Sequence, residues 1–147
     1  MPVIIVDIDG TLLNGSSGIK KTIDYVNSQK ATHDIYIVSG RNKSEDAATR
    51  AALAKNGVSY NRLYLNPSST SETLVHKKII AQKLLTREHV VLAIDNNENM
   101  RRMYESLGIN SNNFFSYILP NSKSNWKFIL YIYYINNILL NRIFKNQ

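Results

Sequence analysis

The first twelve residues constrain the fold more than any other part of the sequence. Four apolar residues, 3–6, run directly into two carboxylates, Asp7 and Asp9, that are separated by one residue. A run rich in valine and isoleucine is typical of a strand buried on both faces of a parallel sheet, so we expect a first strand at residues 3–7. A buried carboxylate is costly unless a cation pairs with it, and ligands of open α/β sheets bind at this end of the strands. The two acids therefore predict a functional site.

Strand-like apolar runs alternate with helical patterns along the rest of the chain. Further strands are expected at residues 35–38, 62–65, 90–94 and 114–119. Helices are expected at residues 19–29, 44–55, 72–86 and 98–107. In the third helix, four residues are candidates for the core-facing side: Leu74, Ile79 or Ile80, and Leu84. The repeated alternation predicts an α/β fold with a mainly parallel sheet between two helical layers.

Length, charge and cysteine content limit the class of protein. A chain of 147 residues suits one domain with a hydrophobic core. The net charge of +7 favours anionic partners such as nucleic acid or phosphorylated molecules, although a surplus of surface lysine explains it equally well. The chain has no cysteine and begins with a core strand instead of a secretory signal, so we expect a cytoplasmic protein without disulfides.

The composition changes near residue 106. Residues 106–147 contain four Lys or Arg and no Asp or Glu. We expect a main domain at residues 1–119 and a basic, apolar extension at residues 120–147. The longest uncharged apolar stretch there has 8 residues, and a membrane-spanning helix needs about 20. A terminal helix or strand packed on the domain is expected, while a segment on a membrane or partner surface and a poorly folded extension remain alternatives.

Polar side chains follow three of the expected strands, and a lysine pair precedes the last of these: Asp7 and Asp9, Ser39, Lys77 and Lys78, and Asp95. The carboxyl ends of parallel strands meet at one edge of a sheet, so we expect one shared cleft. Carboxylates bind Mg²⁺, one carboxylate can attack phosphorus, and another can move a proton. A hydroxyl, backbone N–H groups and a lysine can stabilise the transferring oxygens. Asp-Gly and Ser-Gly pairs are also common in turns, but their ordered combination favours phosphoryl transfer.

The ordered polar segments resemble the motifs of a known superfamily. Residues 7–12, Asp-Ile-Asp-Gly-Thr-Leu, resemble the D-x-D-G-T-L signature of the haloacid dehalogenase (HAD) superfamily. Residues 37–41 resemble its second motif, Lys77 or Lys78 its third, and residues 94–97 its fourth, with the match running over residues 3–119 in the right order. The resemblance implies a Rossmann-like three-layer sandwich and a phosphatase that works through an aspartyl-phosphate.

The resemblance also implies roles for individual residues. Asp7 would be the nucleophile, and Asp9 the general acid and base. The phosphoryl group would be bound by Thr11, Ser39, Gly40 and Lys77. A Mg²⁺ cofactor would be held by Asp7, Asp9, Asp95 and Asn96. Many relatives have a second acid where this chain has Asn96, whose amide oxygen can still hold Mg²⁺ or its water.

The spacing of the motifs leaves no room for the inserted cap domain that is usual in HAD enzymes of small metabolites. A capless, open site favours a substrate that itself covers the cleft. The chain looks most like the phosphatase domain of polynucleotide kinase 3′-phosphatases, which implies action on nucleic-acid 3′-phosphate ends, although the third strand ends in Leu65-Asn66 where that branch often has Met-Arg. No phosphate-binding kinase loop is present. Alternatives are a phosphatase of small nucleotides or sugar phosphates, and a phospho-ligand binding module without turnover.

Overall fold

Five parallel strands form the central sheet in the computed structural model, which describes residues 1–67 and 72–113. In sequence order they are β1 (Val3–Val6), β4 (Asp34–Asn42), β5 (Arg62–Asn66), β6 (Val90–Ile94) and β7 (Ser111–Asn112). Their order in the sheet is β5-β4-β1-β6-β7, and every neighbouring pair is parallel. The four strands expected before residue 95 are confirmed, and the one expected at residues 114–119 lies outside the described residues.

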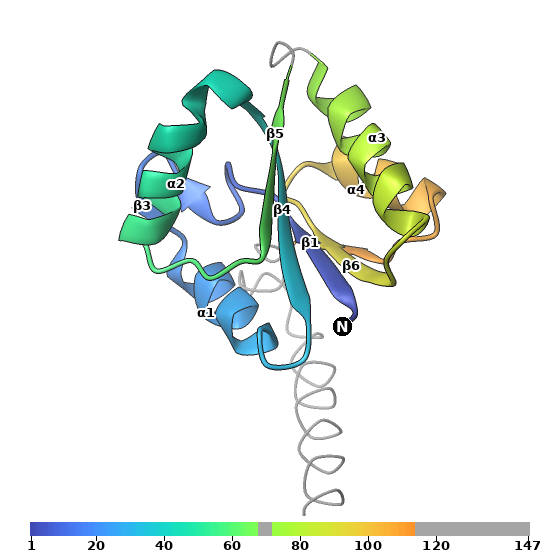
Figure 1. Cartoon of the computed structure of the whole chain (residues 1–147), viewed down its shortest axis with the longest axis horizontal. Helices are drawn as coiled ribbons and strands as arrows, with labels where there is room; N and C mark the ends of the chain where they lie inside the picture. The colour runs from blue at the N-terminus through green and yellow to red at the C-terminus, as the bar shows by residue number, and fades with distance from the viewer. Residues whose placement is uncertain (68–71, 114–147) are drawn as a thin grey trace, which may run out of the picture. The chain divides into compact units, whose positions relative to one another are not determined.

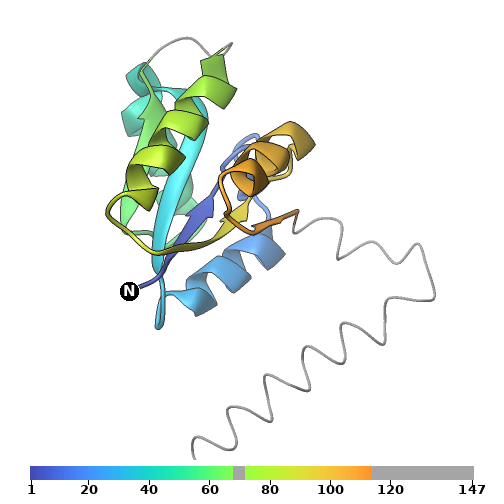
Figure 2. The ribbon, with the colours of Figure 1, turned by 90° about the vertical axis from the view of Figure 1, so that its right-hand side faces the viewer.

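Helices cover both faces of this sheet. They are α1 (Lys20–Gln29), α2 (Asp46–Lys55), α3 (Thr73–Leu85) and α4 (Glu98–Ser106). Figure 1 shows α1 and α2 on one side of the sheet and α3 and α4 on the other. In Figure 2 the pair α3 and α4, which contact each other, lies in front of the sheet. The predicted Rossmann-like three-layer α/β fold is confirmed.

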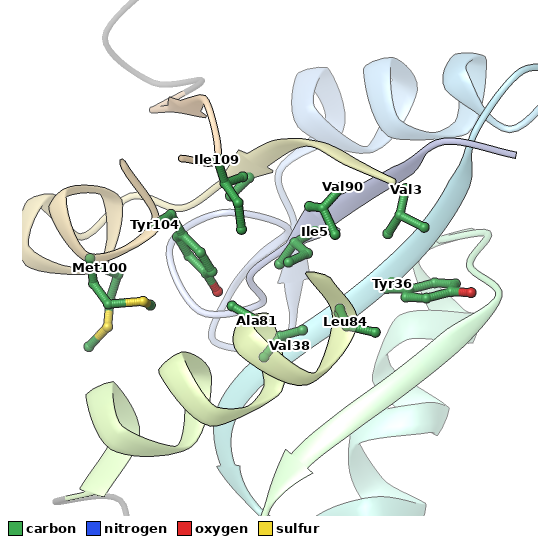
Figure 3. Close-up of a cluster of buried hydrophobic side chains, with 12 residues drawn as sticks. Val3, Ile5, Tyr36, Val38, Ala81, Leu84, Val90, Met100, Tyr104 and Ile109 are labelled. Atoms are coloured by element: carbon green, nitrogen blue, oxygen red, sulfur yellow. The ribbon is translucent and has the colours of Figure 1, made fainter. Parts of the chain in front are cut away.

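The central strand β1 explains the uninterrupted apolar run at the start of the chain. Successive side chains of a strand point to opposite faces. Val3 and Ile5 accordingly join the core under α3 and α4, whereas Ile4 and Val6 join the core under α1 and α2. All four are buried, so both faces of β1 require apolar residues. Figure 3 shows the first of these cores, with Tyr104 projecting into it from α4.

The inward face of α3 differs from the prediction. Leu74 and Ile79 are exposed, at 40% and 56%, so they do not face the core. Leu84 is buried and Ile80 packs against the core, as expected for one of the two isoleucines. The buried set also contains His76 and Lys77, which apolar periodicity could not select. Lys77 faces inward and forms ion pairs with two acids, Asp7 and Asp95.

The connections around the sheet are short. After β1, the chain makes a small antiparallel hairpin of β2 (Leu13–Asn14) and β3 (Ser17–Gly18) before α1. Between β4 and α3 it contains the 3₁₀ turn η1 (Lys43–Glu45), α2 and β5. No separate cap domain is therefore inserted among residues 1–67 and 72–113. Within the same residues, no helix has the length and apolar character needed to span a bilayer. The extension expected at residues 120–147 lies outside the described part.

Candidate active site

A buried ion-pair cluster lies at the carboxyl end of the sheet. Lys77 Nζ is 2.6 Å from Asp7 Oδ1 and 2.7 Å from Asp95 Oδ2. Asp7 follows β1, Asp95 follows the neighbouring strand β6, and Lys77 reaches both from α3. The side chains are only 8%, 1% and 3% exposed for Asp7, Asp95 and Lys77. The next residue, Lys78, is exposed, so the structure brings Lys77 and not Lys78 to the acids.

Burial and charge act in opposite directions in this cluster. Burial raises the pKa of Asp7 to about 6, although Lys77 opposes the rise. Burial alone would lower the pKa of Lys77, but the charges and hydrogen bonds of Asp7 and Asp95 outweigh it and raise that pKa. When all three groups are ionised, two carboxylates face one ammonium. The cluster then carries one surplus negative charge, which makes it receptive to a further cation.

The second acid of the first motif lies at the surface. The Asp9 side chain is 55% exposed and forms an ion pair with Arg41, in which Arg41 Nη2 lies 2.6 Å from Asp9 Oδ1 and Arg41 Nε lies 2.9 Å from Asp9 Oδ2. Arg41 was not among the site residues predicted from the sequence. Its position directly after Ser39-Gly40 was the available signal, but β4 had to extend to Asn42 to carry it to the cleft.

The Thr11 side chain contacts both Asp7, after β1, and Asn96, after β6. Its Oγ1 is 3.4 Å from Asp7 Oδ2 and 3.4 Å from Asn96 Oδ1, and it accepts a hydrogen bond of 3.1 Å from the Asn96 N–H. Thr11 is buried, whereas Asn96 is exposed. The hydroxyl of Thr11 therefore contacts the neighbouring site residues directly.

Ser39 and Gly40 lie where β4 approaches the first turn of α3. Ser39 is fully buried, and its Oγ accepts a hydrogen bond of 3.2 Å from the Arg41 N–H. A Cβ at Gly40 would lie 2.5 Å from Thr73 Oγ1. Only glycine allows this approach without displacing Thr73. Gly40 therefore permits the close packing of β4 against the first turn of α3.

The oxygen atoms of this site suit Mg²⁺, which prefers oxygen ligands. Asp7 Oδ2 and Asn96 Oδ1 both lie next to the Thr11 hydroxyl, and neither takes part in the ion pair with Lys77. Asp95 already uses Oδ2 for Lys77 and Oδ1 for the Asn97 N–H, at 2.9 Å. Within the described residues there is no group of three His, Cys, Asp or Glu that could hold a metal ion. The fit to Mg²⁺ therefore depends on the amide oxygen of Asn96.

An open groove of about 510 Å³ lies along the edge strand β5 and between α2 and α3. Lys43, Tyr64, Asn66 and His76 are among the residues that line it. None of Asp7, Asp9 or Asp95 contributes to its walls. The groove and the acids nevertheless share α3, because His76 lines the groove and the next residue, Lys77, binds the acids.

Gly10 is a position where we expect a substitution to disturb Asn96. Gly10 has a φ of +77°, and a Cβ there would lie 2.2 Å from Asn96 Nδ2. Gly15 has a φ of +61°, and a Cβ there would meet no described atom beyond its chain neighbours within 4 Å, so Gly15→Ala isolates the backbone strain. We expect about 1 kcal/mol of destabilisation for Gly15→Ala and about 1–3 kcal/mol more for Gly10→Ala, measured by urea unfolding. Equal losses would mean that Asn96 moves aside freely.

Comparison with solved structures shows a related fold. A structure described as the Pnkp1/Rnl/Hen1 RNA repair complex matches with a TM-score of 0.68 and 20% identity, over 76% of this chain and 42% of that chain. A second structure of the Pnkp1/Rnl/Hen1 complex matches with a TM-score of 0.63 and 20% identity, over 76% of this chain and 45% of that chain. This chain thus spans less than half the length of either. At these identities the likeness establishes the fold.

Comparison with sequences places the chain in a family. A search of curated protein sequences finds no match. The model of the haloacid dehalogenase-like hydrolase family matches residues 4–145, which is nearly the whole chain. The match agrees with the parallel sheet and with the acids that follow β1. The chain therefore belongs to the haloacid dehalogenase-like hydrolases.

Proposed function

We propose that this hydrolase is a Mg²⁺-dependent phosphomonoesterase that works through an aspartyl-phosphate on Asp7. The observation that carries the proposal is the arrangement of the two acids of the first motif. Asp7 is buried and held by Lys77, whereas Asp9, two residues later, is half exposed at the cleft. A fixed carboxylate suits a nucleophile, and an exposed one suits proton exchange with a leaving group and with water.

The chemistry follows from these positions. A carboxylate oxygen of Asp7 forms a bond to phosphorus while the bond from phosphorus to the ester oxygen breaks, and the protonated Asp9 gives its proton to that leaving oxygen. Water then attacks the phosphorus and gives a proton back to Asp9, and the bond between phosphorus and Asp7 breaks to release phosphate. Lys77 holds Asp7 in place and offsets its charge. Arg41, the ion-pair partner of Asp9, provides a cation for the phosphoryl oxygens.

All the ligands that we propose for Mg²⁺ are oxygen atoms. Asp7, Asp9, Asp95 and Asn96 would hold Mg²⁺, with Asp9 contributing its backbone carbonyl. When bound, the cation supplies positive charge for the phosphoryl oxygens. The surplus negative charge of the Asp7, Lys77 and Asp95 cluster supports this assignment.

For the substrate we propose 3′-phosphate ends of nucleic acid. Three observations support this class: the absence of a cap among the described residues, the net charge of +7, and the likeness to a chain of an RNA repair complex. The alternatives are small nucleotide or sugar phosphates, and phospho-ligand binding without turnover. Phosphate release and the choice of oligonucleotide substrate distinguish these alternatives from the main proposal.

The first test is phosphate release from an aryl phosphate. We expect the chain to release phosphate with Mg²⁺ present, and we expect EDTA to stop the release and added Mg²⁺ to restore it. Colorimetric measurement of phosphate is sufficient. No release with Mg²⁺, Mn²⁺ or Co²⁺ would reject both enzyme hypotheses and leave the binding module.

The second test compares oligonucleotides that differ only in the position of the phosphate. We expect the 3′-phosphorylated oligonucleotide to give a kcat/KM about tenfold or more above that of the 5′-phosphorylated one and of a free 3′-mononucleotide, which corresponds to about 1.4 kcal/mol. The preference over the mononucleotide should shrink as salt increases, because phosphate contacts are screened. Equal rates on all three would favour a phosphatase of small substrates.

A further inference from the structure

Arg101 makes an unusual set of contacts at the fourth motif. It lies in the first turns of α4, and its Nη1 donates hydrogen bonds of 3.0 Å to the Asp95 carbonyl and 2.9 Å to the Asn96 carbonyl. Its own backbone N–H donates to the carbonyl of Asn97 at 3.1 Å. A single residue therefore binds three successive carbonyl groups of the turn that joins β6 to α4.

These carbonyls lie just beyond the hydrogen bonds of the sheet. The last backbone bonds at this edge run from the Asp7 N–H to the Ile94 carbonyl and from the Asp95 N–H to the Asn112 carbonyl. Residues 96–99 that follow are exposed, so water competes for their polar groups. Backbone carbonyls need a partner, and here the guanidinium of Arg101 provides it. Arg101 thus binds the carbonyl side of the turn, while Thr11 and the Asp95 carboxylate accept from the N–H groups of Asn96 and Asn97.

The turn carries both fourth-motif residues of the candidate site. The Asn96 side chain lies directly over the backbone of Gly10, and its amide oxygen lies next to Thr11. These contacts hold Asn96 from the side of β1, and Arg101 holds its carbonyl from the side of α4. Loss of the Arg101 contact would leave the hydrogen bonds with Thr11, so the amide oxygen would be held less tightly.

We propose that Arg101 is a positioning residue for Asp95 and Asn96, two of the residues that would hold Mg²⁺. By binding the carbonyls of Asp95 and Asn96, it holds the turn that places the Asn96 amide oxygen next to the Thr11 hydroxyl, which also contacts Asp7. This inference rests on the proposed function, because it assigns the divalent cation to these oxygens. Partners that orient metal ligands affect metal affinity by about 10–100-fold.

The chain offers a matched control in the adjacent arginine. Arg102 is exposed, and the contact shown for it is an ion pair of 2.6 Å with Glu98 on the same helix. Arg101→Met removes the carbonyl contacts, and Arg102→Met removes an equal charge from the next position. Arg101→Lys retains the charge and one donor group, so it should preserve part of the effect.

Two measurements test the proposal. One is the rise in melting temperature caused by Mg²⁺ without substrate, and the other is the Mg²⁺ concentration that gives half-maximal phosphate release. For Arg101→Met we expect the half-maximal concentration to rise about tenfold or more and the thermal shift to shrink, while the KM for the aryl phosphate at saturating Mg²⁺ stays within about twofold. Arg101→Lys should be intermediate, and Arg102→Met should match the wild type.

The possible results separate this inference from the proposed function. A thermal shift with Mg²⁺ but no phosphate release would reject the phosphatase, and the comparison of thermal shifts would still test Arg101. A lower melting temperature with an unchanged response to Mg²⁺ would show a purely structural arginine and overturn the inference. A wild type without any response to Mg²⁺ or Mn²⁺ would overturn it as well. If Arg101→Met does not fold, the same comparison between Arg101→Lys and the wild type decides.

Discussion

Lys77→Met is expected to lower the free energy of unfolding by about 3–5 kcal/mol, the usual loss when one partner of a buried ion pair is removed. The reason is that Asp7 and Asp95 would remain in the same buried space without their shared cation. Urea unfolding at pH 7 measures the effect. Lys78→Met is the matched control, because Lys78 is the next residue on the same helix but is exposed. We expect that control to change stability by about 0.5 kcal/mol or less.

A second variant keeps this prediction testable if Lys77→Met folds poorly. Adding Asp95→Asn removes one of the two uncompensated carboxylates, so the double variant should recover part of the lost stability. Stability losses of the same size for Lys77→Met and Lys78→Met would contradict the buried cluster. So would a double variant that is less stable than Lys77→Met alone.

Asp7→Asn is expected to have opposite effects on activity and on stability. It removes the proposed nucleophile, so phosphate release should fall by about 10³-fold or more. It also removes a charge that burial disfavours, while Lys77 keeps its second partner Asp95. The variant should therefore be more stable than the wild type at pH 7–8, by roughly 1–3 kcal/mol. Asp24→Asn, at an exposed ion pair on α1, should change neither property appreciably.

The stabilisation caused by Asp7→Asn should increase as pH rises. The pKa of Asp7 is raised from 3.8 to about 6 in the folded state. Between these values the folded protein binds more protons than the unfolded chain, so the contribution of Asp7 to stability falls as pH rises. The advantage of Asp7→Asn should be small below pH 4 and complete above about pH 6. An advantage that grows as pH falls would show that Asp7 is not the buried group described here.

Much of the architecture follows from local sequence patterns. The continuous apolar runs at β1 and β6 mark strands that are covered on both faces, and alternation with helices implies a parallel sheet. The polar residues after these strands were therefore expected at one edge of the sheet, and Asp7 and Asp95 do meet there through Lys77. These inferences depend only on neighbours in the sequence and on a topological rule.

The side-chain geometry of the cleft depends on contacts between distant residues. Lys77 and Asp7 are 70 positions apart. Local periodicity placed Leu74 and either Ile79 or Ile80 inward, but it could not select the buried Lys77. Arg41, near the end of β4, likewise pairs with Asp9, which lies 32 positions earlier in the chain.

The amino-acid sequence was thus sufficient for four strands of the sheet, the four helices and the family motifs, because these follow from patterns along the chain, whereas β2, β3 and β7 were not expected. The choice between Lys77 and Lys78, the pairing of Asp9 with Arg41 and the contacts of Arg101 with the Asp95 and Asn96 carbonyls were decided only in the tertiary structure. The physical reason is that each contact depends on which groups packing brings within hydrogen-bond distance. For the buried Lys77 cluster, the cost of leaving a charge unpaired adds to this selection.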